Sequence, residues 1–116
     1  MADRSRVAAG AAGERRAALE YRRLGFETVD RNWRCAGAEI DLVVRCDDLI
    51  VFVEVKTRRR RSLSEALAAV DGAKQERIRV GAQRWLMAHP EHAGDRIRFD
   101  AVAVVDGIVE VVEGAF

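Results

Sequence analysis

The sequence predicts an α/β domain in which a helix is followed by three strands, a second helical segment and two further strands. Three observations carry this prediction: an N-terminal helical segment that stops at Gly25, two apolar strand-like runs at 39–45 and 49–56, and an Asp-Gly turn at 106–107. With 116 residues, 49% of them hydrophobic, the chain can bury one core but has no room for a second. We therefore expect residues 11–116 to form a single domain.

The first element is expected to be a helix over residues 11–24. Its apolar stripe is formed by Ala17, Ala18, Tyr21 and Leu24. Gly25 should end it, because glycine readily adopts the left-handed conformation of a helix C-cap. Glu14 lies seven residues before Tyr21 and so shares the inward-looking face of the helix. Residues 1–10 are expected to be a disordered N-terminal extension or a continuation of this helix.

A first strand is expected at 26–33, followed by an antiparallel hairpin made of 39–45 and 49–56 around a short turn at 46–48. Side chains alternate between the faces of a strand. The alternation predicts that one face of the first hairpin strand carries Ile40, Leu42 and Val44. The register predicts that residue 41 lies across from residue 53 or 54.

Three charged residues interrupt this apolar hairpin: Asp41, Glu54 and Lys56. Glu54 and Lys56 are two residues apart and therefore point to the same face, while Asp41 is expected close to Glu54 at one end of the hairpin. Burying a single charge costs several kcal/mol, so the three charges indicate a site. Two carboxylates suit a Mg²⁺ ion, and the ammonium suits an attacking water or a phosphate. The alternative is a plain salt bridge at a strand end, with the aspartate in solvent.

The second half of the chain predicts a helical segment from Ser62 or Ser64 to about residue 89, with Gly72 as a break. The positions expected to be buried are Leu67, Val70, Ile78, Ala82, Trp85 and Leu86. A strand at 97–105 and a second strand at 108–112 should follow, joined by the Asp-Gly turn.

Charge, cysteine spacing and hydrophobicity bear on whether the protein binds nucleic acid, zinc or a membrane. The 20 basic and 19 acidic residues give a formal charge of +1, so overall charge does not indicate a nucleic-acid-binding protein. Arg58, Arg59, Arg60 and Arg61 form a local basic run that binds a phosphate backbone in one interpretation and is a solvated loop in the other. Cys35 and Cys46 lack zinc-binding spacing. Without a long apolar run or a signal-peptide core, we expect a soluble cytoplasmic protein with no membrane contact.

Several segments resemble a known family. They are Gly13-Glu14, Leu24-Gly25-Phe26, Arg31-Asn32-Trp33-Arg34, residues 37–42, residues 51–58, Lys74-Gln75, Arg98-Phe99-Asp100 and Ala115-Phe116. Through the aspartate at 41 and the Glu-Val-Lys at 54–56, the chain is similar to the PD-(D/E)xK nuclease superfamily. Over nearly its full length it resembles the bacterial YraN-like family of restriction-endonuclease-like proteins. This resemblance implies a restriction-endonuclease-like core, a mixed five-stranded sheet flanked by helices.

The resemblance also implies roles for individual residues. Asp41 and Glu54 would hold Mg²⁺, for which Mn²⁺ can substitute, and Lys56 would be catalytic. Glu14 would be a supporting carboxylate in the catalytic set. Lys74 and Gln75 would join the arginine run in contacting nucleic acid. The sequence departs from the family pattern at 70–73, which replaces a proline-containing turn before Lys74.

Three functional hypotheses follow. The first is a Mg²⁺-dependent endonuclease that hydrolyses phosphodiester bonds in structured or branched DNA. The second is a non-catalytic nucleic-acid-binding or scaffold module that keeps the nuclease fold, and the third is a structural protein whose charges pair internally. Junction-type relatives pair two sites across a homodimer, and the sequence leaves both a monomer and a dimer open. Glu39 and Asp100 receive no role.

Overall fold

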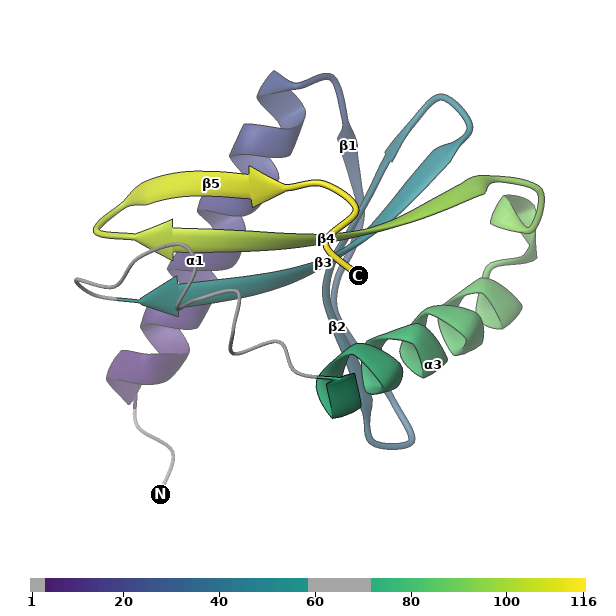
Figure 1. Ribbon diagram of the computed structural model, residues 1–116, viewed down its shortest axis with the longest axis horizontal. Helices are drawn as coiled ribbons and strands as arrows, with labels where there is room; N and C mark the ends of the chain where they lie inside the picture. Colours follow the sequence, from purple (N-terminus) through teal and green to yellow (C-terminus); the bar gives the residue numbers. More distant parts are fainter. Residues whose placement is uncertain (1–3, 59–71) are drawn as a thin grey trace.

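The structure, a computed structural model, has a five-stranded sheet with a helix on either side (Figure 1). It describes the backbone of residues 4–58 and 72–116 and the side chains of residues 10–57 and 72–116. The elements are α1 (Arg4–Arg23), β1 (Glu27–Cys35), β2 (Ala38–Cys46), β3 (Leu49–Arg58), α3 (Gly72–Ala88), a short 3₁₀ turn (Pro90–His92), β4 (Arg96–Val105) and β5 (Ile108–Val112). This order confirms the predicted α/β architecture. Neither helix, within the described part of the chain, is long and apolar enough to cross a membrane.

The sheet is mixed, and its strands lie in sequence order from β1 to β5. Neighbouring strands are antiparallel except for β3 and β4, which run parallel from the pair Leu49 and Arg96 to the pair Arg58 and Val105. Parallel neighbours need a long crossover, and α3 lies within it. Strand β3 has a partner on each side and is covered on both faces, which accounts for its continuous apolar run.

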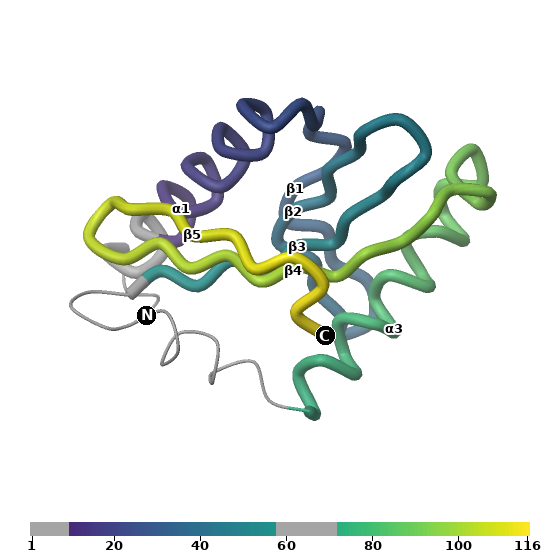
Figure 2. Tube along the Cα trace, turned by 45° about the horizontal axis from the view of Figure 1, so that its top comes forward, coloured from purple at the N-terminus to yellow at the C-terminus, as the bar shows by residue number. Residues whose placement is uncertain are grey.

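Helices α1 and α3 lie against opposite faces of the sheet (Figure 2). A hydrophobic layer lies beneath each helix. The layer beneath α1 contains Ala17, Ala18, Tyr21, Leu42, Val44, Val51, Val53, Val102 and Val104. The layer beneath α3 contains Ile40, Val43, Ile50, Phe52, Ile78, Ala82 and Trp85. The predicted burial of Ile78, Ala82 and Trp85 is confirmed, whereas Leu67 and Val70 lie outside the described residues.

The C-terminus of α1 is closed by Gly25, as predicted. Its φ of 98° lets the Phe26 N–H donate to the Tyr21 carbonyl at 2.9 Å and the Gly25 N–H to the Arg22 carbonyl at 3.0 Å, the two bonds of a Schellman motif. The Phe26 ring then packs edge-on against Tyr21, with centroids 5.5 Å apart. The prediction that Leu24 belongs to the buried stripe is wrong: Leu24 is 45% exposed. The chain reverses at Gly25 and buries Phe26 partly instead.

Two hairpin turns use residues with positive φ at both central positions. Asp106 and Gly107 have φ values of 50° and 79°, and Ala36 and Gly37 have 49° and 82°. Such turns match the right-handed twist of the strands that they join. The predicted Asp-Gly turn is confirmed, while the Ala-Gly turn has a weaker sequence signal.

Asp100 is a completely buried carboxylate that anchors α1 and the C-terminal segment to β4. One oxygen accepts from the Tyr21 hydroxyl at 2.7 Å, the other from the Gly114 N–H at 3.0 Å, and Arg98 donates to both at 2.9 Å. Burial and the Asp100 charge together raise the pKa of Tyr21, so its hydroxyl stays a donor. Asp100 therefore serves the fold on the α1 side of the sheet.

Replacing Asp100 should destabilise the protein strongly. In Asp100→Asn, an amide NH₂ faces the donors that the carboxylate now satisfies, and the buried ion pair is broken, which typically costs about 3 kcal/mol or more. Urea unfolding should show this loss. The matched control is Asp48→Asn, whose exposed ion pair with Arg96 contributes much less. Equal losses in the two variants would contradict the anchoring role.

Candidate functional site

The hairpin of β2 and β3 opens at Asp41. Regular pairing ends at Leu42 and Val53, so the register places Asp41 across from Glu54, as the sequence predicted. Beyond this point a side chain of β2 accepts a backbone hydrogen bond from β3: Asp41 Oδ2 accepts the Val55 N–H at 2.9 Å. Asp41 is thereby fixed at the place where the two strands part.

The alternation of side chains along β2 is interrupted at the same residue. Leu42 packs beneath α1, whereas Ile40 packs beneath α3. The prediction that Ile40 shares a face with Leu42 and Val44 is therefore wrong. Opposite Asp41 on β1, Asn32 has a φ of 49°, a left-handed conformation that asparagine tolerates better than most residues. The local distortion of both strands turns Asp41 toward β3.

Glu54 is buried, with 5% of its surface exposed, and two lysines hold its carboxylate. Lys56 Nζ lies 2.8 Å and Lys74 Nζ 2.6 Å from the same Oε1 atom. Burial by itself would raise the pKa of Glu54, but hydrogen bonds and charge from the two lysines outweigh it and hold the pKa below its ordinary value. Glu54 is an ionised carboxylate whose burial is compensated by two ammonium groups.

The pKa of Asp41 is shifted in the opposite direction, above its ordinary value. Burial raises its pKa to about 8, and the charge of Glu54 and a hydrogen bond shared with it act in the same direction, against the Val55 N–H. Two carboxylates so close together cannot both ionise unless a positive group lies between them. Near neutral pH the pair therefore retains a proton in a place that suits a cation.

The two lysines differ in basicity. Burial lowers the pKa of Lys56, and the neighbouring Lys74 lowers it further, against the attraction of Glu54. Burial would also lower the pKa of Lys74, but its hydrogen bonds to Glu54 and Lys56 raise it overall. Lys56 is consequently the lysine that releases a proton more readily.

Helix α1 brings Glu14 to the edge of this group. A Cβ at Gly13 would overlap the Thr57 hydroxyl as it is oriented here, so the glycine helps α1 to approach β3 closely. Burial raises the pKa of Glu14, with help from the charges of Glu39 and Glu54, while a hydrogen bond from the Asn32 side chain and the charge of Arg31 oppose the increase. Glu14 also contributes to the raised pKa of Asp41, so it lies within electrostatic reach of the pair.

Asp41, Glu54 and the two lysines surround a cavity of about 420 Å³, and Glu14 is not among the residues that line it. It is lined by Gly37, Glu39, Asp41, Glu54, Val55, Lys56, Lys74, Arg77 and Ile78. Of the predicted site residues, the structure brings together Asp41, Glu54, Lys56 and Lys74. Gln75 follows Lys74 on α3. The Arg58 side chain and residues 59–61 lie outside the described part of the chain, so the predicted phosphate contacts of the arginine run stay predictions.

Sequence reasoning missed Arg77 and Asn32. Arg77 lies three residues after Lys74 and so on the same face of α3, a spacing that was readable from the sequence. Asn32 contributes through its bond to Glu14 and its left-handed φ, which no sequence pattern announced.

The donor set suits a hard divalent cation held by few protein ligands. Within residues 10–57 and 72–116 no three His, Cys, Asp or Glu side chains gather as a metal cage. Two facing carboxylates, Asp41 and Glu54, are nevertheless what Mg²⁺ uses when water and substrate oxygens complete its shell. The raised pKa of Asp41 beside Glu54 indicates that positive charge is favoured at this place.

Comparison with known sequences supports this region as part of one family domain. The sequence model described as "Uncharacterised protein family UPF0102" matches residues 13–104. The chain is 44% identical to a UPF0102 protein of Frankia casuarinae over 118 residues, covering 97% of this chain and 99% of that protein. It is 46% identical to a UPF0102 protein of Kineococcus radiotolerans, covering 87% and 83%. It is 41% identical to one of Pseudomonas entomophila, covering 90% and 85%.

The shared proton predicts how stability depends on pH. A pKa raised from 3.8 to about 8 means that the folded state binds a proton the unfolded state releases, so this contribution is complete below about pH 4 and is lost as the pH rises through 8. Asp41→Asn imitates the protonated form. It should flatten the loss of stability between pH 5 and 8 and raise the free energy of unfolding at pH 8 by about 1 to 3 kcal/mol.

Urea unfolding at pH 5, 6, 7 and 8 measures this effect. The lowered pKa of Glu54 acts below this window, because its stabilisation is lost only as the pH falls through that pKa. Asp47→Asn, in the exposed turn between β2 and β3, is the matched control and should keep the wild-type profile. An unchanged profile in Asp41→Asn would show that the carboxylate pair holds no proton.

Proposed function

The chain belongs to the UPF0102 family. We propose that it is an endonuclease, which hydrolyses phosphodiester bonds with the help of a metal ion. The observation that carries the proposal is the pair of facing carboxylates, Asp41 and Glu54, with Lys56 Nζ 2.8 Å from Glu54. Facing carboxylates and an ammonium group are the elements needed to hold a divalent cation beside a phosphate.

In this proposal Asp41 and Glu54 hold Mg²⁺, or Mn²⁺ in its place. A cation held there would supply a water molecule of lowered pKa and positive charge beside the scissile phosphate. The Val55 N–H keeps Asp41 oriented toward β3. Lys74 balances the charge of Glu54, because its Nζ lies 2.6 Å from a carboxylate oxygen.

Lys56 is proposed to serve the attacking water. Because its pKa is lowered, Lys56 loses its proton more easily and becomes a neutral amine. A neutral amine can accept the proton that the water loses as its oxygen bonds to phosphorus. The P–O bond to the leaving oxygen breaks, and that oxygen takes up a proton from solvent. Glu14, hydrogen-bonded to Asn32 at the edge of the site, would orient a water molecule.

The substrate is proposed to be DNA, in a branched or otherwise structured form. This part of the proposal rests on the resemblance to PD-(D/E)xK nucleases. The lining of the cavity favours an anionic polymer as the substrate, because Lys56, Lys74 and Arg77 line it beside the carboxylates. These cations can contact phosphates on either side of the bond that is cut.

One observation favours the second hypothesis, a non-catalytic nucleic-acid-binding module. The Glu54 oxygen already has two ammonium partners, within 2.8 Å, so the site is electrostatically compensated there without a metal. A module of this kind would bind DNA with strong salt dependence, ignore chelators and never cleave. The two experiments below separate it from the endonuclease.

The first experiment measures metal binding by titration calorimetry with Mn²⁺. Asp41→Asn and Glu54→Gln should each weaken binding by more than about tenfold, since losing even a supporting group around a metal site has effects of that size. Glu110→Gln, which changes an exposed carboxylate on β5, should bind Mn²⁺ as the wild type does. Equal binding by all four proteins would exclude a metal held by this pair.

The second experiment measures cleavage of labelled four-way junctions, flaps and single strands with Mg²⁺ or Mn²⁺. Lys56→Met should lower the rate by about 10² to 10⁴, the usual contribution of a proton-transfer group, and Asp41→Asn should remove activity. Glu110→Gln should cleave normally. Cleavage at the wild-type rate by both site variants would identify a contaminant, and the endonuclease proposal would fail.

A further inference from the structure

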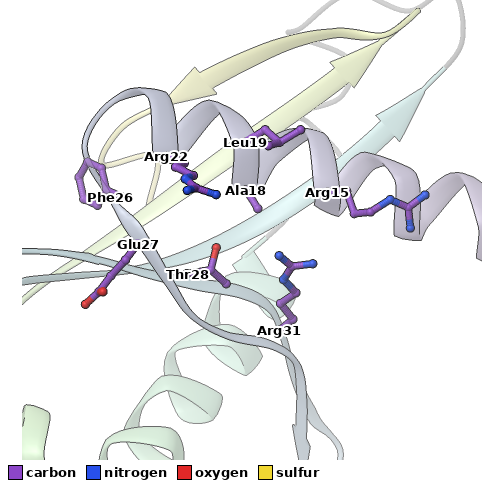
Figure 3. Close-up of a pocket in the computed structure, with 8 residues that line it drawn as sticks. All are labelled: Arg15, Ala18, Leu19, Arg22, Phe26, Glu27, Thr28 and Arg31. Carbon is purple, nitrogen blue, oxygen red and sulfur yellow. The ribbon is translucent and has the colours of Figure 1, made fainter.

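A second cavity lies between α1 and the start of β1, outside the carboxylate site. Its volume is about 500 Å³. It is lined by Arg15, Ala18, Leu19, Arg22, Phe26, Glu27, Thr28 and Arg31 (Figure 3). The four residues from α1 are spaced three, four and seven apart, so they form one stripe of the helix. Three arginines therefore surround one hollow from two different elements.

These three arginines are not used by the fold. Among the described residues, no hydrogen bond or ion pair is found for the guanidinium groups of Arg15, Arg22 or Arg31. The other arginines on this part of α1 are engaged: Arg16 donates to the Gly107 carbonyl at 3.1 Å, and Arg23 pairs with Glu20 at 2.6 Å. Like charges gathered around one cavity repel one another, which is tolerated where an anion binds.

The walls of the cavity favour a phosphate. Figure 3 shows Arg22 and Arg31 extending into the space between helix and strand, whereas the Glu27 carboxylate points away from them. Guanidinium groups bind phosphate oxygens through parallel hydrogen bonds, and the Thr28 hydroxyl can donate one more. Leu19 is 65% exposed beside them and offers an apolar surface to a sugar or base.

The arginine cavity lies next to the carboxylate site along the chain, although no described residue lines both. Arg15 directly follows Glu14 on α1, and Arg31 directly precedes Asn32 on β1, while Glu14 and Asn32 share a hydrogen bond. The charge of Arg31 acts on Glu14. From Glu14 to Arg22 the helix rises about 12 Å, so the cavity extends along α1 away from the site.

We propose that the arginine cavity binds the phosphodiester backbone of the DNA strand that passes through the carboxylate site. The inference rests on the proposed function and deepens it: Arg15, Arg22 and Arg31 hold phosphates of the same strand beyond the bond that is cut. They contact the backbone, so they add affinity and position without selecting bases.

Binding of a fluorescent 20-nucleotide single strand and of a four-way junction, measured by anisotropy in EDTA from 50 to 300 mM salt, tests the proposal. Each phosphate contact on a single strand contributes about 0.7 to the slope of log K against log salt. The triple variant Arg15→Gln, Arg22→Gln, Arg31→Gln should therefore lower the single-strand slope by about 2 and weaken binding of both substrates at every salt concentration.

Arg22→Gln and Arg23→Gln form a matched pair on neighbouring positions of α1 with the same change in charge. Arg22→Gln should reduce the slope, and Arg23→Gln should leave it unchanged. Circular dichroism should show the same melting temperature for the wild type and the triple variant, because these arginines make no contact that the fold needs. Equal slopes for the wild type and the triple variant would overturn the proposal.

The assay also separates this inference from the endonuclease. In EDTA no metal-dependent cleavage occurs, so a protein that never cleaves but loses affinity in the triple variant supports the arginine site and contradicts only the enzymatic activity. A protein that cleaves while the triple variant binds normally contradicts the arginine site alone. Loss of binding to anionic lipid vesicles with unchanged DNA affinity would assign the cavity to a membrane surface and also overturn the proposal.

Discussion

Two carboxylates, Asp41 and Glu54, are held opposite each other where β2 and β3 part, and the rest of the site depends on that opposition. Buried like charges repel strongly, so every neighbour of the pair must supply positive charge or a proton. Lys56 and Lys74 supply charge to Glu54, while a proton serves Asp41. A divalent cation meets both needs at once, which is the physical basis of the proposed metal site.

The fold maintains this strained arrangement through elements that are themselves firmly anchored. β3 is central in the sheet, and its apolar neighbours on both faces fix the position of Glu54. Gly13 lets α1 lie against Thr57 and brings Glu14 toward the site. The buried hydrogen bond between Tyr21 and Asp100 fixes the same helix to β4. Helix α3 contributes Lys74 from the opposite face.

The sequence predicted what depends on local periodicity. Alternation along β3 placed Glu54 and Lys56 on one face, and hairpin register placed Asp41 across from Glu54. Prediction from the sequence was wrong where the position of a side chain depends on how two elements contact each other. Ile40 changes face because Asp41 bonds to β3, and Leu24 is exposed because the Gly25 reversal turns Phe26 inward. The pairing of Lys74 with Glu54, and the arginine cavity, arise only when α1, β1, β3 and α3 are placed in space.

Diffraction from crystals soaked in Mn²⁺ tests the central claim most directly, because the anomalous signal identifies the ion and its ligands together. We predict a peak between the carboxylates of Asp41 and Glu54, with Lys74 moved away from the oxygen that it now contacts at 2.6 Å. Crystals that show no ion there at saturating Mn²⁺, with both lysines still on Glu54, would contradict the claim.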